Sequence, residues 1–240
     1  RDGEVRAFHN ICTHRGNKLV AETGNETRGQ ARANTLTCRF HAWSFSCDGR
    51  LKAVAREQSF HGLDKSCLGL PRIHCDTWEG FIFICLADEP EWTLREYLDG
   101  MATHFGGFPY DEATRAYRYS TVLKCNWKVA LYAFGEGYHV PTIHAATLPS
   151  LAKIRHTGFA LHGPHSTSAL HVAGLEKAQP TPVTGLLGGM LKTSERYGPR
   201  GDRLPESINP ERRADFHFEF PVFFPNFIMH VCSGYAYPGM

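Results

Sequence analysis

The fold of this chain is decided by two short segments, CTHRG at residues 12–16 and CRFHAW at residues 38–43. Together they supply two thiols and two imidazoles, from Cys12, Cys38, His14 and His41. Such a set predicts a two-iron, two-sulfide cluster in which the cysteines bind one iron and the histidines bind the other. Because neutral imidazoles replace two anionic thiolates, the reduction potential of such a cluster lies well above that of an all-cysteine cluster. A zinc site with the same four ligands is the alternative.

The two segments resemble the Rieske cluster motif of the large subunits of Rieske non-haem iron oxygenases. The Arg15-Gly16 pair after the first half-site and Trp43 after the second are typical of that family. The chain departs from the family pattern at Ala42, where the family usually has glycine, and in the gap between the half-sites, which is longer than usual at 23 residues. We expect the extra length, about residues 21–34, to form a surface loop extension, because chains tolerate longer loops at little cost.

Length and composition are those of an ordinary globular protein. The 240 residues suffice for one large or two ordinary domains, and 42% of them are hydrophobic and 21% charged. The formal net charge of +2 gives no indication of nucleic acid or of an anionic membrane as a partner. No apolar run approaches the roughly 20 residues that span a bilayer, and no signal peptide is visible. The chain begins Arg1-Asp2-Gly3, and we expect it to be a fragment cut at both ends.

Eight cysteines are present, and the proposed cluster uses two of them. The other six have no metal-ligand spacing and are predicted to be reduced and structural: Cys47, Cys67, Cys75, Cys85, Cys125 and Cys232. An iron–sulfur cluster together with free thiols favours a reducing, cytoplasmic location.

Residues 1–90 are predicted to form the first domain, from short strands and turns. Asp48-Gly49 predicts a hairpin turn. The near-continuous apolar run 78–86 predicts one buried strand that closes the domain. The second domain, residues 91–240, begins with a capping box at Thr93 and Glu96, which predicts a helix through about Met101.

A second candidate site lies in NWKVALYAFGEGYHVPTIH, residues 126–144. Asn126 is predicted to cap a helix that places Glu136 and His139 on one face. His139 and His144 would stand about 140° apart on an unbroken helix, too far to bind one ion. Pro141 must kink or stop the helix near His139, which lets His144 fold back toward it. Two imidazoles and a carboxylate would suit ferrous iron with open positions for oxygen.

This segment also resembles the oxygenase family, which carries an Asn-Trp-Lys opening, an acidic residue, a Tyr-His pair and a second histidine five residues later. The resemblance implies that His139 and His144 bind a mononuclear iron. It implies that Glu136 links this iron across a subunit interface to the neighbour's cluster, although the family more often has aspartate there. The family also often has Glu-Asn where this chain has Tyr132-Ala133. Its third ligand is a distant downstream carboxylate, which we expect beyond Met240; Glu136 itself is the alternative.

Downstream of this site, residues 159–173 and 216–232 are each predicted to form a long strand. The segment 174–214 between them is rich in Pro, Gly and charge, and is either a lid over the substrate or disordered. Six phenylalanines could line an apolar pocket or belong to the sheet core: Phe216, Phe218, Phe220, Phe223, Phe224 and Phe227. Asp202, Glu206 and Asp215 are expected to be solvated.

The resemblance implies an α+β fold, with an antiparallel Rieske domain followed by a truncated helix-grip domain in which an antiparallel sheet wraps over a helix. It implies a head-to-tail trimer, alone or with three small subunits, that takes electrons from a reductase, directly or through a ferredoxin. Oxygen and an organic substrate, which the resemblance favours as aromatic, would then give a hydroxylated or dealkylated product. A Rieske electron carrier without catalysis and a zinc-stabilised binding protein are the alternatives. The sequence leaves open the substrate and the choice between mono- and dioxygenation.

Overall fold

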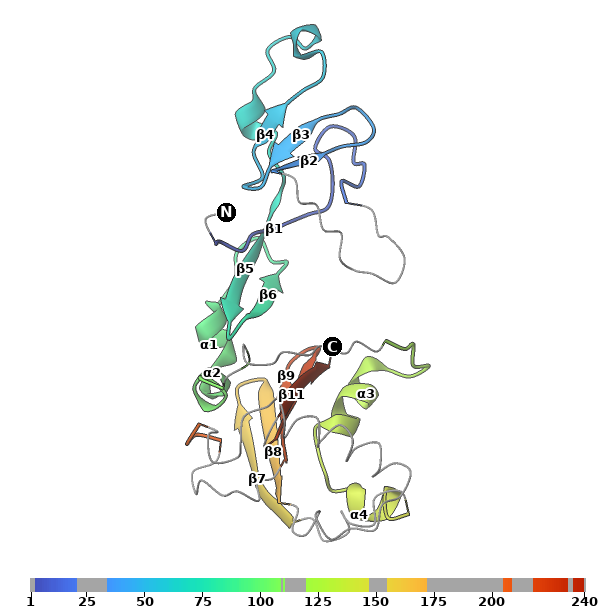
Figure 1. Cartoon of the computed structure of the whole chain (residues 1–240), viewed down its shortest axis with the longest axis vertical. Coiled ribbons are helices and arrows are strands. Elements are labelled where there is room, and N and C mark those ends of the chain that lie inside the picture. Colours follow the sequence, from blue (N-terminus) through green and yellow to red (C-terminus); the bar gives the residue numbers. More distant parts are fainter. Residues whose placement is uncertain are drawn as a thin grey trace. The chain divides into compact units, whose positions relative to one another are not determined.

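The computed structural model describes residues 3–20, 34–108, 110, 120–146, 155–171, 205–208, 218–232 and 235–239. The chain divides into two compact units, Arg1–Glu91 and Trp92–Met240, which are described separately below (Figure 1). No helix in the described part of the chain has both the length and the apolar character that a bilayer crossing requires.

The first unit contains two small antiparallel sheets (Figure 1). One is made of β2 (Thr35–Thr37), β3 (Ser44–Ser46) and β4 (Leu51–Ala53), and the other of β1 (Ala7–Phe8), β5 (Arg72–Trp78) and β6 (Phe81–Cys85). Two short 3-10 helices, Glu57–Ser59 and Lys65–Cys67, follow β4. The core of the unit gathers around the β2–β3–β4 sheet, and its buried members are Cys12, Leu19, Cys38, Trp43, Phe45, Leu51, Val54 and Leu70.

The predicted turn at Asp48-Gly49 is confirmed. It joins β3 to β4, with the Ser46 N–H donating to the Arg50 carbonyl at 2.9 Å. Gly49 has a φ of +87°, and a Cβ there would lie 2.3 Å from the ring of Phe8. Glycine is therefore required at this position both by the backbone conformation and by the close approach of the ring.

The prediction of one buried strand over residues 78–86 is wrong. Glu79 and Gly80 both have positive φ, at 49° and 82°, and they form a tight two-residue turn between β5 and β6. Along β6 the side chains alternate in exposure, and Ile82 and Ile84 are each 59% exposed. The apolar run is thus the turn and second strand of a hairpin with one face open, rather than a strand covered on both faces.

The second unit begins with the predicted capping box. The Glu96 N–H donates to Thr93 Oγ1 at 3.3 Å, and the Thr93 N–H donates to the Glu96 carboxylate at 2.8 Å. The helix that follows is broken, because α1 (Leu94–Leu98) and α2 (Gly100–His104) are separated by Asp99 with a φ of 48°.

A five-stranded antiparallel sheet forms the centre of the second unit, in the order β11-β10-β9-β8-β7. Its strands are β7 (Arg155–His162), β8 (His165–His171), β9 (Phe218–Phe223), β10 (Phe227–Cys232) and β11 (Tyr235–Gly239). Each segment predicted to be one long strand is therefore a hairpin, with turns at residues 163–164 and 224–226. Of the predicted long loop 174–214, only residues 205–208 are described, so its proposed lid lies outside the described part.

Helices cover both faces of this sheet. On one face α1 and α2 contact the strands through Tyr97 with His165 and through Phe105 with Phe223, with ring centroids 4.8 and 6.2 Å apart. On the other face lies α3 (Trp127–Phe134). Its Phe134 ring is 5.7 Å from the ring of His230. The predicted α+β class, with an antiparallel sheet over a helix, is confirmed.

The predicted cap of α3 is confirmed as well. The Lys128 N–H donates to Asn126 Oδ1 at 3.0 Å, as an N-cap side chain should accept. At the other end the helix closes at Gly135, where a Cβ would lie 2.9 Å from a methyl group of Val222. The glycine thus lets the end of α3 approach β9 closely.

Two buried histidines of this unit are held neutral. The Phe224 N–H donates to His165 Nδ1 at 3.0 Å, so the proton is on Nε2, which donates to the Tyr97 carbonyl at 2.7 Å. Burial lowers the pKa of His165 below its ordinary value, and burial lowers the pKa of His230 to about 4. Protonating either ring in the folded protein would place a positive charge where water cannot solvate it.

We expect the second unit to lose stability on mild acidification. A histidine with a depressed folded-state pKa stabilises the fold fully above the unfolded value of about 6.5, and this stability is lost as the pH falls toward the folded value. For His230 the loss between pH 7 and pH 5 is about 2 kcal/mol. Urea denaturation at the two pH values, followed by tryptophan fluorescence, measures it. The His230→Leu variant is the control, and an equal pH dependence in both proteins would contradict the expectation.

Candidate functional site

The two predicted cluster segments form loops of the same design. In the first loop the Cys12 carbonyl accepts from the Gly16 N–H at 2.9 Å, and the Cys12 N–H donates to the carbonyl of the next residue, Asn17, at 2.8 Å. In the second, the Cys38 carbonyl accepts from the Ala42 N–H at 3.0 Å, and the Cys38 N–H donates to the next residue, Trp43, at 2.8 Å. Each loop therefore turns back on its own cysteine and projects the residues between.

The two loops bring the cysteine thiols together. Cys12 and Cys38 are 2% and 3% exposed, and their thiols are in hydrogen-bonding contact with each other. Burial raises the pKa of Cys12. Burial acts in the same direction on Cys38, but the N–H groups of Phe40 and His41 donate to its sulfur, and the net effect lowers the pKa of Cys38. Donors aimed at a buried sulfur favour the thiolate, which is the form that binds a metal.

The two imidazoles are also neighbours. The ring centroids of His14 and His41 are 4.7 Å apart, and His14 stacks on Trp43 at 4.6 Å with an interplanar angle of 7°. Partial burial, and then the positive charges of His41 and Arg15, lower the pKa of His14. A neutral imidazole is the form that binds iron. The donors thus come as a thiol pair and an imidazole pair, which fits a [2Fe-2S] cluster with one iron for each pair.

Ala42 occupies the position in the second loop that Gly16 occupies in the first, and both have a left-handed backbone, with φ of 57° and 72°. An alanine in this region costs about 1–2 kcal/mol relative to the right-handed region, and glycine has no such cost. We therefore expect Ala42→Gly to raise the free energy of unfolding by about 1 kcal/mol. Thermal denaturation of the cluster-bearing protein measures it. Ala53→Gly, in strand β4, is the control and should destabilise by about 0.5–1 kcal/mol; a loss of stability in both variants would contradict the expectation.

The second candidate site lies just after α3, and its local structure differs from the prediction. The helix ends at Phe134, so Glu136 and His139 do not share a face of one continuous helix. A separate short helix, α4 (Val140–Ile143), begins after His139, and Pro141 lies in its first turn, where its missing N–H costs nothing. The break that the histidines need is thus made by Gly135, four residues before His139, rather than by the proline.

The residues of this site nevertheless come together. The ring centroids of His139 and His144 are 5.3 Å apart, with an interplanar angle of 62°. Glu136 bonds to His139 twice, because its carboxylate contacts the Nδ1 of the ring and accepts from the backbone N–H at 3.2 Å. Burial raises the pKa of Glu136, but the two bonds from His139 outweigh burial, and the net effect lowers it.

This geometry suggests different roles for Glu136 and His139. A carboxylate on Nδ1 fixes the ring tautomer and leaves Nε2 of His139 available to a metal. His139 and His144 therefore fit two ligands of a divalent iron, and Glu136 fits the outer carboxylate that orients one of them. Of the other predicted carboxylates, Asp202 and Asp215 lie outside the described residues, and Glu206 is exposed. Within the described ranges no three or more His, Cys, Asp or Glu side chains converge on one ion, so the third ligand stays a prediction.

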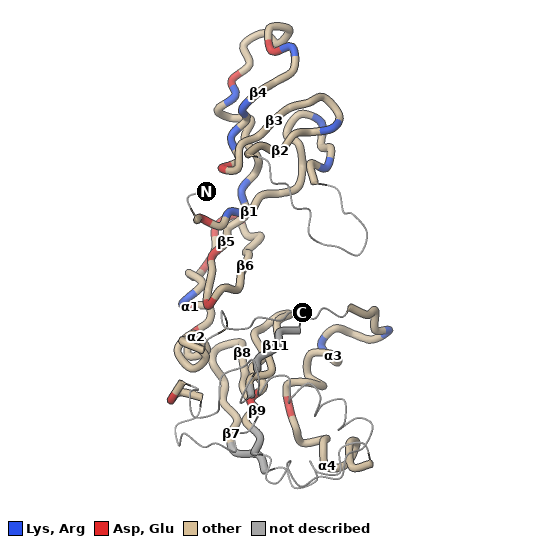
Figure 2. Tube along the Cα trace, in the orientation of Figure 1, with Lys and Arg blue, Asp and Glu red and all other residues tan. Residues whose placement is uncertain are grey.

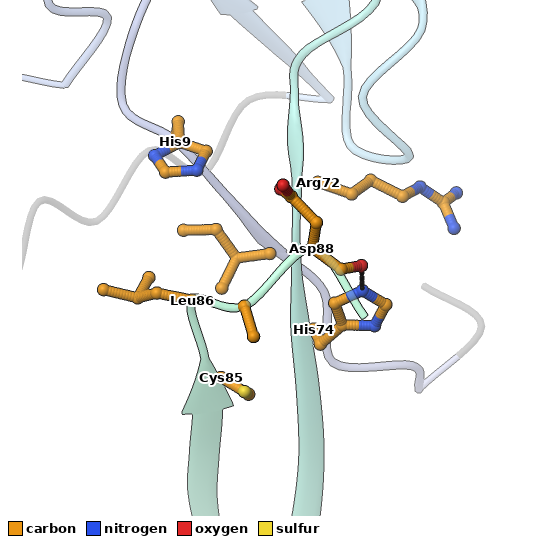
Figure 3. A pocket seen from close by; sticks show the side chains of 8 residues that line it. His9, Arg72, His74, Cys85, Leu86 and Asp88 are labelled. Atoms are coloured by element: carbon orange, nitrogen blue, oxygen red, sulfur yellow. Dashed lines mark hydrogen bonds between the residues drawn. The ribbon is translucent and has the colours of Figure 1, made fainter. Parts of the chain in front are cut away.

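A recess in the first unit holds other titratable residues (Figure 3). A ring nitrogen of His74 bonds to the Asp88 carbonyl at 2.9 Å, and His74 lies opposite Cys85 across the β5–β6 pair. In Figure 3 the side chains of His9 and Arg72 extend away from His74 rather than converging on a common point. None of the predicted ligands lies in this recess.

Two family models match the chain. The Rieske [2Fe-2S] domain matches residues 1–69, and the ring hydroxylating alpha subunit (catalytic domain) matches residues 110–237. The first match contains all four predicted cluster ligands, and the second contains Glu136 and both predicted iron ligands.

Curated relatives include both dioxygenases and monooxygenases. The large oxygenase component of the naphthalene 1,2-dioxygenase system of Pseudomonas aeruginosa is 36% identical over 161 residues, which are 62% of this chain and 33% of that protein. The carnitine monooxygenase oxygenase subunit of Acinetobacter baumannii is 31% identical over 147 residues, which are 60% of this chain and 38% of that protein. The matched region thus spans only 33–38% of the length of these relatives.

Solved structures agree with the fold. A structure of naphthalene 1,2-dioxygenase with indole bound in the active site superposes with a TM-score of 0.68 at 26% identity, over 96% of this chain and 54% of that one. A quaternary ammonium Rieske monooxygenase gives a TM-score of 0.65 at 20% identity, over 98% of this chain and 53% of that one. The second likeness concerns the fold alone.

Proposed function

This chain belongs to the family of Rieske non-haem iron oxygenase alpha subunits, and from that premise we propose that it is part of an oxygenase component that oxidises an organic substrate with O2. The observation that carries the proposal is the pairing of the rings of His139 and His144, 5.3 Å apart, directly after a helix that packs on the sheet. An electron carrier has no use for this second pair of imidazoles.

We assign the metal ligands residue by residue. Cys12 and Cys38 would hold one iron of the Rieske cluster, and His14 and His41 the other. His139 and His144 would hold a mononuclear iron. When bound, the cluster supplies single electrons and the mononuclear iron supplies the activation of oxygen.

The surrounding residues set the properties of these ligands. The N–H groups of Phe40 and His41 and the amide of Asn17, which lies 3.8 Å from the sulfur, stabilise the charge on Cys38. Trp43 supports one side of the His14 ring. Such outer contacts orient metal ligands and tune the potential of the metal.

Glu136 is proposed to connect the two metal sites of neighbouring copies. Its carboxylate holds His139 through Nδ1 and is 42% exposed as a side chain, so part of it is open to a second partner. An imidazole of another copy's cluster, from His14 or His41, is the partner we propose. This requires a head-to-tail arrangement of copies, which closes into a ring such as a trimer.

Further partners are proposed from the family. A reductase, directly or through a ferredoxin, would reduce the cluster, and small subunits could complete the assembly. The names of the relatives span naphthalene, 2,4-dinitrotoluene, glycine betaine and carnitine, so membership of the family leaves dioxygenation and monooxygenation both open. None of the seven described cysteines forms a disulfide, which suits the cytoplasmic location that we propose.

Metal analysis of the purified protein tests the proposal against its alternatives. We expect about three irons and two acid-labile sulfides per chain, with a Rieske signal in the EPR spectrum of the reduced protein. Two irons and no substrate-dependent oxygen uptake would instead indicate an electron carrier. A colourless protein that contains zinc and no EPR signal would indicate a zinc-stabilised binding protein.

A further inference from the structure

Three hydrogen bonds join α1, β8 and the turn between β9 and β10 in a closed ring. His165 Nε2 donates to the Tyr97 carbonyl at 2.7 Å, and the Phe224 N–H donates to His165 Nδ1 at 3.0 Å. The Tyr97 hydroxyl donates to the Phe224 carbonyl at 2.6 Å, which completes the ring. Both backbone polar groups of Phe224 are thus bound by side chains from outside the hairpin, and these side chains hold the turn in place.

His165 suits this position because a neutral imidazole accepts at one nitrogen and donates at the other. The side chain is buried, and its ring meets the ring of Tyr97 edge to face, with centroids 4.8 Å apart. The described strands β8, β9 and β10 contain no Lys or Arg (Figure 2), and their single carboxylate, that of Glu219, bonds to His104 and Thr167. No charged group of these strands therefore competes for the two nitrogens of His165.

The same hairpin holds α3 at both ends. At the start of the helix, the ring of Trp127 lies 6.1 Å from the ring of Phe224, which is within the range of an aromatic pair. At the end of the helix, Gly135 lies against Val222 of β9. Phe224 thus belongs to both sets of contacts, because its backbone is bound by α1 and β8 while its ring meets α3.

The segment with the proposed iron ligands starts where α3 is held. Glu136 follows Gly135 directly, and His139 comes three residues later. A metal binds more tightly to ligands that are already in place, because they do not have to be ordered when it binds. A hairpin that fixes α3 therefore also helps the site to retain its iron.

We propose that His165 is a positioning residue of the proposed iron site, and that it acts through its hydrogen bond to the Phe224 N–H. By this bond it fixes the β9–β10 turn, the turn fixes α3, and α3 fixes the segment that carries His139 and His144. The inference rests on the proposed function, because it takes these two histidines as iron ligands. It deepens that function by assigning to the iron site a residue that does not contact the metal ligands.

Two substitutions of His165 separate its two hydrogen bonds. The amide of asparagine lies as far from the backbone as Nδ1, so His165→Asn can still accept from the Phe224 N–H but cannot reach the Tyr97 carbonyl. Glutamine is one methylene longer, so His165→Gln can reach the Tyr97 carbonyl but has no acceptor at the position of Nδ1. Each variant thus keeps one bond of the two, and only His165→Asn keeps the one that the inference requires.

The rate at which ferrous iron passes from the holoprotein to the chelator ferrozine measures how firmly the site holds it. We expect His165→Gln to release the mononuclear iron about tenfold faster than the wild type, and His165→Asn less than about twofold faster. The Rieske EPR signal should keep its intensity in both. Ala102→Gly is the control, because it weakens α2 without changing these bonds, and it should release iron at the wild-type rate.

A substitution of Phe224 tests the next step. Phe224→Ala keeps the backbone bonds to Tyr97 and His165 but removes the ring that meets Trp127. The side chain is 41% exposed, so the variant should fold, and it should also release iron about tenfold faster. Equal release from His165→Asn and His165→Gln, or release at the wild-type rate from Phe224→Ala, would overturn the inference.

Hydrogen exchange of the α3 amides separates this inference from the proposed function. Read by mass spectrometry, it does not depend on iron, and it should be faster in His165→Gln and Phe224→Ala than in the wild type and His165→Asn. If the wild type holds about three irons but the two His165 variants do not differ, the inference alone is overturned. A wild type with about two irons contradicts the proposed function, and the exchange of the α3 amides then still decides whether His165 positions the helix.

Discussion

Replacing His144 by alanine should remove the mononuclear iron and abolish substrate oxidation while the Rieske cluster remains. The ring of His144 lies 5.3 Å from that of His139, and the two are the proposed protein ligands within this chain. With one imidazole left, ferrous iron loses a neutral nitrogen ligand that water replaces only weakly. Because even the loss of an outer-sphere partner costs 10–100-fold in metal affinity or activity, the loss of a direct ligand should lower turnover by at least about a hundredfold.

Iron content and the EPR signal of the cluster measure this result separately. The iron count should fall from about three to about two per chain, and the reduced Rieske signal should keep its intensity. His9→Ala, a change of an exposed histidine in the other unit, is the matched control and should keep all three irons. If His144→Ala also retained three irons and normal oxygen uptake, the iron site would have to lie elsewhere.

The cluster loops could be predicted from sequence because the residues that determine each loop lie close together in the chain. Each ligand pair stands within four residues, and each loop closes on its own cysteine, as with Cys12 and Gly16. The same holds for the cap at Asn126 and the capping box at Thr93 and Glu96, which depend on neighbours three or fewer residues away.

Predictions failed where a turn lacked a strong signal. The pair Glu79-Gly80 forms a two-residue turn without the Asn or Asp that usually marks one, and the apolar residues around it gave the false impression of one buried strand. The hairpin turn at Gly163 was overlooked in the same way, although it divides the long apolar segment into β7 and β8. In both cases the chain alternates between an open and a covered face, which a count of apolar residues does not reveal.

The end of α3 was misplaced for a different reason. Pro141 is an obvious helix breaker in the sequence, but the helix ends at Gly135, where a Cβ would lie 2.9 Å from Val222, 87 residues further along the chain. The phenylalanines of β9 and β10 show the same dependence on tertiary structure. Phe223 and Phe227 stack at 5.2 Å in the core below α1 and α2, while Phe220 faces α3. The burial of His165 and His230 likewise follows from packing, and nothing in their spacing predicted it.

Replacing Glu136 by glutamine should slow turnover by about 10–100-fold while leaving both metal sites filled. The glutamine carbonyl can still accept from Nδ1 of His139, so the orientation of the ring and the iron should be preserved. What is lost is the negative charge, which the two bonds from His139 favour in the folded protein. If Glu136 connects the sites, electrons should leave the reduced cluster more slowly when O2 and substrate are added, and this rate is read from the decay of the Rieske absorption. If the variant showed a normal decay of the Rieske absorption and normal turnover, Glu136 would have no role in this electron transfer.

Mixing two impaired variants decides whether that path crosses between copies. Cys38→Ser should lack the cluster but keep Glu136 and the iron ligands, whereas Glu136→Gln keeps the cluster but lacks the connection. If each cluster serves its neighbour in a head-to-tail ring, a Glu136→Gln copy can supply electrons to an adjacent Cys38→Ser copy. When the two variants are co-expressed in equal amounts, about one interface in four joins the cluster of a Glu136→Gln copy to the iron site of a Cys38→Ser copy. About a quarter of normal turnover should therefore return. If each cluster served its own chain, no mixed assembly would contain a complete path, and the mixture would be no more active than its parts.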